Sequence, residues 1–202
     1  MLLYIRDALG LGVEASALVP PLAGEVLVPD RKDLVGPDAR QQAADSWVAW
    51  WSRGVAAQGR TELGPHGMAR DEWHRRIADL HRQVADPPEW SSLSRCAALQ
   101  RAVGALYEEG ARWIGAARPP FLPPARRDIF EWALVRDVAE ATAAAHEVSK
   151  GALNGCALVL LVEGSWWELV SPGVALCSVA AATDPAQAAT VVRQIFASAL
   201  VA

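Results

Sequence analysis

The feature that most constrains this chain is a change of hydrophobic period late in the sequence. Between residues 39 and 149, apolar residues recur three and four positions apart, which is the spacing of one face of an α-helix. From Cys156 onward, "CALVLLVE" (156–163) is instead a continuous apolar run, which is typical of a buried β-strand. The chain must therefore pack helices against a small sheet, and we expect a helix-rich α+β fold.

The spacing predicts four helices before this change, over residues 39–58, 69–85, about 92–117 and 125–149. The second helix has the clearest apolar stripe, which consists of Trp73, Ile77, Leu80 and Val84. In the third, Gly110 indicates either a break or a close approach to another helix. The fourth is apolar on more than one side in its first half, and we expect it to be the buried central helix.

The last part of the chain reads as a three-stranded antiparallel meander followed by a C-terminal helix. Gly164-Ser165 suits a two-residue hairpin turn, and Pro172-Gly173 suits a type II turn. Asp184 is the expected N-cap of a helix over 185–200, because proline is favoured at the first helical position and residue 185 is a proline.

The chain length and the positions of proline and glycine predict a single domain over residues 1–202. A chain of 202 residues buries roughly 70% of the surface that its unfolded form exposes, so it needs neither disulfides nor a metal for stability. Residues 1–38 are rich in proline and glycine and are expected to form an extended arm with one or two short strands. The helical part is then 39–150, and the meander with its closing helix is 151–202.

Charge and hydropathy argue against two classes of partner. The net charge is −4, and the arginines of the middle region are interleaved with acidic residues, so we expect no nucleic-acid binding. The longest apolar run, "GCALVLLV" (155–162), is too short to span a membrane. Three scattered cysteines and an N-terminal apolar stretch interrupted by Arg6 and Asp7 lead us to expect a cytoplasmic location.

The sequence contains no complete catalytic or cofactor motif. It has no P-loop, no G-x-G-x-x-G opening a helix and no G-x-S-x-G elbow. The weak candidates for metal ligands are Asp71 and His74, one helical turn apart, with His66 from the preceding loop. We favour the simpler interpretation, in which an acid at the start of a helix lies near an exposed histidine and no metal is bound. We therefore predict no metal and no cofactor.

The predicted hairpin gives the most specific candidate site. Alternation along the strands places Trp166, Glu163 and Glu168 on one face, while Trp167 points to the other face and toward the core. The predicted opposite pairs are Glu163 with Trp166, Leu161 with Glu168, and Glu168 with Cys177. A carboxylate beside Cys177 disfavours the thiolate, so we do not expect this cluster to be catalytic. It either is a solvated or helix-covered face of the sheet, or binds a ligand or partner through Trp166 and the glutamates.

Nine tryptophans in 202 residues are the most unusual feature of the composition. Most fall on predicted core faces, and Trp50 lies at the edge of the face formed by Ala44, Trp47, Val48, Trp51 and Val55. Trp50 is therefore a further candidate for partner binding. The alternative is that tryptophans line a pocket for a small ligand.

Two functional hypotheses follow. In the first, the protein is a non-enzymatic interaction protein that uses an exposed sheet or helix face to bind an unknown protein partner or a second copy of itself, as a homodimer. In the second, it is a small-molecule enzyme or ligand-binding protein with a Trp-lined pocket. That pocket would lie between the helices and the sheet, where glutamate and histidine side chains converge. The absence of a complete catalytic constellation favours the first hypothesis.

Overall fold

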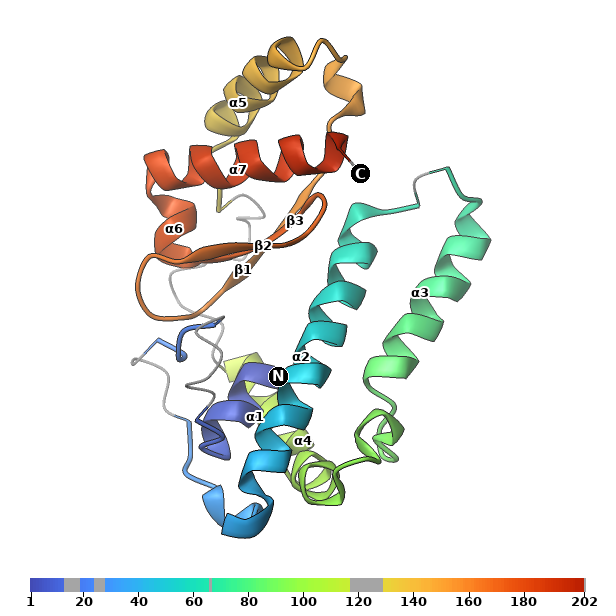
Figure 1. Ribbon diagram of the computed structural model, residues 1–202, viewed down its shortest axis with the longest axis vertical. Coiled ribbons are helices and arrows are strands. Elements are labelled where there is room, and N and C mark those ends of the chain that lie inside the picture. Colours follow the sequence, from blue (N-terminus) through green and yellow to red (C-terminus); the bar gives the residue numbers. More distant parts are fainter. Residues whose placement is uncertain (13–18, 24–27, 66, 117–128, 202) are drawn as a thin grey trace. The chain divides into compact units, whose positions relative to one another are not determined.

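The computed structural model describes residues 1–12, 19–23, 28–65, 67–116 and 129–201 (Figure 1). These residues form seven α-helices and one three-stranded sheet, which confirms the helix-rich α+β class. The chain divides into two compact units, residues 1–58 with 67–121 and residues 59–66 with 122–202, and each is described by itself. None of the helices in the described ranges has the length and apolarity to cross a bilayer.

The first unit is helical. Its elements are α1 (Leu2–Ala8), α2 (Arg40–Leu63) up to Gln58, α3 (Arg70–Val84) and α4 (Ala97–Ala116). Short 3₁₀ turns precede α2 and α4, at Lys32–Leu34, Pro37–Ala39 and Ser91–Leu93. Helices α2, α3 and α4 therefore correspond to the first three predicted helices, with boundaries shifted by up to five residues. Residues 118–124, which separate the third and fourth predicted helices, lie outside the described residues.

The prediction of strands in the N-terminal arm is wrong for residues 2–8, which form α1. The run "LLYI" gave a strand signal because it is short and continuously apolar, a pattern that does not distinguish a strand from a buried helix. The buried residues of this segment are Leu3, Tyr4, Ile5, Arg6, Ala8, Leu9 and Leu11. Tertiary burial of a helix face therefore decides the conformation of this segment.

Two of the three tryptophans of α2 are core residues, and the third, Trp51, is half-buried. Trp47 and Trp50 are each 1% exposed, and their indole N–H groups donate hydrogen bonds to the carbonyls of Leu2 (2.9 Å) and Val84 (2.7 Å). The ring of Trp50 meets that of Trp90 edge to face, with centroids 6.2 Å apart. Trp50 thus lies inside the unit and not at the edge of the apolar face. A buried indole with its N–H bonded packs the helices and fixes their register.

Gly110 permits a close approach and does not break its helix, since α4 continues to Ala116. A Cβ atom at Gly110 would lie 2.6 Å from Sδ of Met1 and 3.0 Å from Cδ1 of Tyr4. Both distances are shorter than normal van der Waals contacts. Of the two alternatives for Gly110, the close approach of a helix, here α1, is therefore confirmed.

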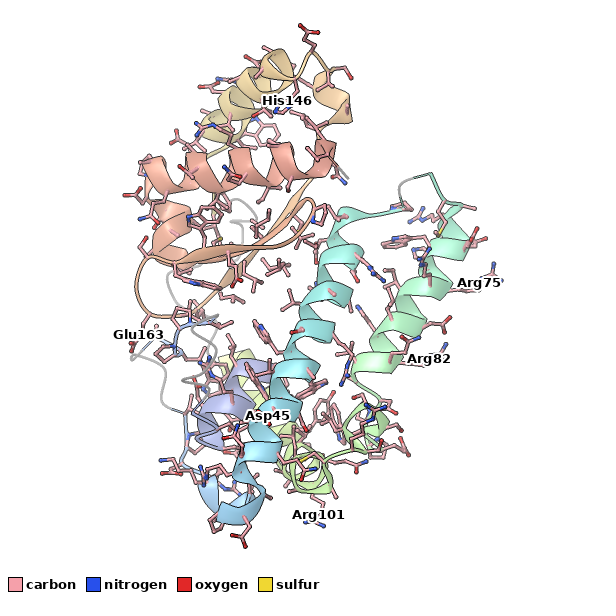
Figure 2. All side chains as sticks on the ribbon, viewed as in Figure 1. Asp45, Arg75, Arg82, Arg101, His146 and Glu163 are labelled. Atoms are coloured by element: carbon pink, nitrogen blue, oxygen red, sulfur yellow. The ribbon has the colours of Figure 1, made fainter. Side chains whose placement is uncertain are left out.

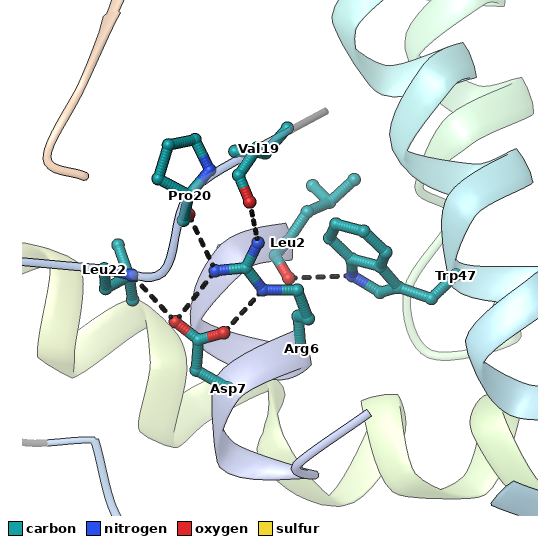
Figure 3. Close-up of polar contacts among 7 residues, drawn as sticks. All are labelled: Leu2, Arg6, Asp7, Val19, Pro20, Leu22 and Trp47. Carbon is teal, nitrogen blue, oxygen red and sulfur yellow. Dashed lines mark hydrogen bonds and ion pairs between the residues drawn. The ribbon is translucent and has the colours of Figure 1, made fainter. Parts of the chain in front are cut away.

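Arg6 and Asp7 tie α1 to the segment around residues 19–22 (Figure 3). The Arg6 guanidinium forms an ion pair with Asp7 and donates to the carbonyls of Val19 (2.9 Å) and Pro20 (3.1 Å). The Asp7 carboxylate also accepts the backbone N–H of Leu22 at 3.1 Å. Arg6 is only 6% exposed, whereas the Asp7 side chain is 22% exposed, so the guanidinium is the largely desolvated partner and its hydrogen bonds offset the cost of burial.

The second unit stacks α7, and beyond it α5, on one face of a small sheet (Figure 1). The strands are β1 (Cys156–Leu160), β2 (Trp167–Ser171) and β3 (Val174–Ser178). The helices are the last turn of α2, α5 (Trp132–Ala145), α6 (Val179–Thr183) and α7 (Pro185–Leu200), and a 3₁₀ turn spans Lys150–Ala152. Asp184 caps α7 as predicted, because its side chain accepts the N–H of Gln187 at 2.8 Å.

The prediction that the fourth helix is central is wrong. In α5 only Thr142 and Ala143 are buried, and Trp132 is 70% exposed. Helix α7 instead contributes Ala188, Val191, Val192 and Ile195 to the core. An alanine-rich helix has small apolar side chains on every side, so its composition alone does not show which side packs.

The predicted antiparallel meander is also wrong, because the sheet is mixed. The strand order is β1-β3-β2, with β1 parallel to β3 and β2 antiparallel to β3. The Pro172-Gly173 turn does join adjacent strands, and Gly173 has the positive φ of +74° that a type II turn requires. Residues 161–166, however, do not form a tight hairpin. They cross β3 and connect β1 to β2, which lie two strand spacings apart, or roughly 10 Å.

The central place of β3 explains the burial of the sheet. All five residues of β3 are buried, whereas β1 is half-buried throughout. The sequence suggested the reverse, because β1 is the more continuously apolar strand. Alanine, cysteine and serine in β3 are small enough to fit beneath the helices, and neighbouring strands protect both of its edges.

We predict that Arg6→Leu destabilises the protein by about 3 kcal/mol, because it leaves the Asp7 carboxylate without its cation. Arg82→Leu is the control. Arg82 pairs with Asp79, but their side chains are 72% and 57% exposed, so the change should cost less than about 1 kcal/mol. Urea unfolding followed by circular dichroism measures both, and equal losses would contradict the structural role of Arg6.

We also predict that Gly155→Ala destabilises the second unit by roughly 1–3 kcal/mol through overpacking. Its Cβ would lie 2.0 Å from Cγ2 of Ile195 and 3.3 Å from the carbonyl oxygen of Gly173. The matched control is Gly151→Ala, whose Cβ would meet only Oγ of Ser149 at 3.9 Å. Thermal melts of the two variants should separate clearly, and a stable Gly155→Ala protein would show that α7 does not pack as described.

Candidate functional site

The candidate site is the outer edge of β2. Among the residues that the structure describes, this strand pairs only with β3, so one of its sides faces away from the sheet. The register places Trp167 opposite Cys177, Glu168 opposite Leu176 and Leu169 opposite Ala175. A bulge follows, after which Ser171 lies opposite Val174. The regular part of the edge therefore ends at Leu169.

The pairing of Trp166 with Ser178 shows which backbone groups face outward. Ser178 donates its N–H to the carbonyl of Trp166 at 2.8 Å, and its Oγ accepts the N–H of Trp166 at 3.0 Å. Hydrogen-bonded and non-hydrogen-bonded pairs alternate along an antiparallel ladder. The N–H and C=O groups of Glu168 therefore point toward β3, whereas those of Trp167 and Leu169 point away from it. No other segment of the described chain hydrogen-bonds to those outward groups.

The outward side of β2 also exposes apolar side chains. Leu169 is 38% exposed and Val170 is 37% exposed. The other large apolar side chains exposed in the described ranges are Tyr107, Trp132 and Val201, none of them next to another along the chain. Sequence reasoning missed Leu169 and Val170 as surface residues, because the predicted meander makes β2 the central strand, whereas β2 lies at the edge of the sheet. No signal in the sequence marks β2 as an edge strand.

The two adjacent tryptophans have different roles. Trp167 packs against two clusters of core residues, so its predicted core position is confirmed. One cluster contains Ala175, Val191 and Ile195, and the other contains the α6 residues Ala181 and Ala182. Trp166 lies just before β2 and is half-buried. Its backbone bonds to Ser178 join it to the start of α6, because the same Ser178 Oγ accepts the N–H of Ala181 at 3.1 Å. Trp166 thus helps to fix where β2 begins.

The two glutamates of the predicted cluster lie in different places. Glu168 is half-buried within β2, whereas Glu163 is exposed on the connection between β1 and β2 (Figure 2). The predicted opposite pairs are wrong: β1 is not the neighbour of β2, and Trp167, not Glu168, lies opposite Cys177. A slip of one residue transfers every side chain of a strand to the other face. Leu158 and Leu176 accordingly lie on the face opposite Trp167.

The weak metal candidates do not form a site within the described residues. Asp71 and His74 are exposed on α3, and the His74 ring contacts Trp73 with centroids 5.0 Å apart. His66 lies outside the described residues. The structure brings together no group of three potential metal ligands in the ranges that it describes. Since Trp50 is 1% exposed, that side chain packs the core and does not reach a partner.

The cysteines of the sheet have the properties of packing residues. Burial raises the pKa of the Cys177 thiol to about 12, with a smaller contribution from Cys156. Burial, followed by the negative charge of Glu62, raises the pKa of Cys156 to about 11. A thiol that stays protonated at neutral pH is a poor nucleophile. The sheet therefore offers no activated cysteine at these two positions.

Comparisons with protein-family models, with curated proteins and with solved structures gave no match to this chain. The assignment of a function therefore depends on the geometry alone.

The thiol pKa values predict an alkaline loss of stability. An ordinary thiol has a pKa near 9.0, so above about pH 9 the unfolded chain releases protons that folded Cys156 and Cys177 retain. The stabilisation that comes from the two protonated thiols is therefore complete below pH 9. Above pH 9 the free energy of unfolding falls as the pH rises toward the folded pKa values of about 11 and about 12. Urea midpoints between pH 8 and 10.5 measure this slope.

The double variant Cys156→Ala/Cys177→Ala should show a smaller alkaline slope than the natural chain. A residual slope of the same sign is expected from Tyr4, since burial, with the nearby negative charge of Glu109, raises its pKa to about 12. An unchanged slope in the double variant would contradict the assignment to the thiols.

Proposed function

We propose that the protein is a non-enzymatic interaction protein and that the outer edge of β2 receives an extended segment of another polypeptide. The observation that carries this proposal is the combination at Leu169 of outward backbone N–H and C=O groups with an exposed apolar side chain. An added strand would bond to the backbone of Trp167 and Leu169 and cover the side chains of Leu169 and Val170.

The bulge after Leu169 favours the binding of one short partner segment and disfavours the continued addition of strands to the sheet. Bulges twist the end of an edge strand and interrupt its ladder, and natural proteins use them against edge-to-edge aggregation. Only three residues, 167–169, precede the bulge in regular register. An interaction of this length buries little surface, so we expect weak, reversible binding.

The proposal is tested with three blocked, fluorescently labelled heptapeptides in which valine alternates with threonine, lysine or glutamate. We expect at least one of them to bind the full chain saturably and to slow amide hydrogen exchange at Leu169. If none of the three slows this exchange, the edge of β2 is not a docking site.

Two variants at one position separate backbone pairing from apolar contact. Leu169→Pro removes an N–H that β3 does not use, and proline is tolerated on edge strands in that orientation, so the fold should survive. We expect this variant to lose peptide binding at least tenfold, while Leu169→Thr retains the N–H and binds within a few-fold of the natural chain. Circular dichroism and thermal melts check the fold. Unchanged binding by Leu169→Pro would overturn the proposal.

A further inference from the structure

The side chain at the middle of the β2 edge restricts which partner can pair with it. Glu168 lies between Trp167 and Leu169, the two residues whose backbone groups point outward. The residue of an added strand that faces Glu168 therefore occupies a non-hydrogen-bonded pair. Cα atoms in such a pair are about 4.5 Å apart, and side chains are closest there. The chemistry of that one facing residue matters more than that of its neighbours.

A second copy of this chain fits the edge poorly. Two β2 strands that pair antiparallel through their outward residues must place Trp167 of each opposite Leu169 of the other. This register brings Glu168 directly opposite Glu168 of the second copy. Like charges directly opposite each other destabilise a strand pair, and the short distance increases the repulsion. Glu168 thus acts against self-pairing, in the way that charged residues protect other sheet edges.

A cation in the facing position has the opposite effect. Glu168 is half-buried and forms no ion pair with any described residue. The sequence from 129 to 201 contains seven acidic residues and only three basic ones, Arg136, Lys150 and Arg193. Arg136 and Lys150 are already paired, with Asp137 and Glu140. This part of the chain therefore has negative charge that its own cations do not neutralise, and it attracts basic segments.

The two faces of the added strand need different side chains. Residues of the partner that lie on the same face as Trp167 and Leu169 meet these two apolar side chains, of which Leu169 is exposed. Residues on the other face meet Glu168, so a lysine or arginine fits there. Since side chains alternate along a strand, the partner sequence alternates apolar and basic residues.

We infer that the edge of β2 selects an extended segment in which apolar residues alternate with lysine or arginine, with one basic side chain facing Glu168. This inference rests on the proposed function of the same edge and specifies the chemistry of its partner.

The test uses the same three heptapeptides and a reversal of charge. We expect the natural chain to bind the valine–lysine peptide about fivefold more tightly than the valine–glutamate peptide, with the valine–threonine peptide between them. Glu168→Lys should reverse this order. Glu108→Lys is the matched control, because it changes the net charge equally at an exposed position of α4 and should preserve the order.

The outcomes separate the inference from the function on which it rests. Equal binding of all three peptides, or an unchanged order in Glu168→Lys, would overturn the inference and leave strand addition intact. No binding of any peptide to the natural chain would overturn both. A reversal that Glu108→Lys reproduces would assign the preference to net charge and would also overturn the role of Glu168. Sedimentation velocity provides a further readout, since Glu168→Gln should self-associate more than the natural chain.

Discussion

The position of β3 between β1 and β2 determines the rest of the second unit. Because β3 pairs on both sides, all of its residues are buried, and three of the five, Ala175, Cys177 and Ser178, are small. The same position leaves β2 at the edge and turns Trp167 toward the helices. Ser178 at the end of β3 then joins three elements, since its hydroxyl accepts N–H groups from Trp166 and from the first turn of α6. One buried strand thus fixes which backbone groups of β2 remain unpaired.

The helices were predictable because their signals are local. Apolar residues three and four positions apart identify α2, α3 and α4, and the proline at residue 185 with the Asp184 cap identifies the start of α7. The Pro172-Gly173 turn was predictable for the same reason, because its geometry depends on two adjacent residues. These features require no knowledge of what lies across the core.

The sheet order was not predictable, because nonlocal packing decides it. A six-residue connection between β1 and β2 is compatible with a hairpin and also with a third strand between the two. Both arrangements place β1 and β2 in opposite directions, so alternation alone does not separate them. Only the pairing partner distinguishes them, and it determines whether Leu169 lies in the core or at the surface. The candidate edge therefore lies next to the predicted residues Trp166 and Glu168, but the strand neighbours predicted for them were wrong.

An edge strand that receives a partner has to bind the right segment and avoid the wrong ones, and the two requirements conflict. An apolar edge with free backbone groups pairs with almost any extended chain, including its own copies. A fully charged edge pairs with few. In β2 the two requirements fall on different faces, because Leu169 supplies apolar contact on one face while Glu168 supplies a charge on the other. Backbone pairing gives affinity that does not depend on sequence, so discrimination has to come from the side chains that flank it. In a non-hydrogen-bonded position the side chains of paired strands are closest, so one charge there has its largest effect on which segment pairs. A single carboxylate in that position opposes self-pairing and favours a cation through the same contact.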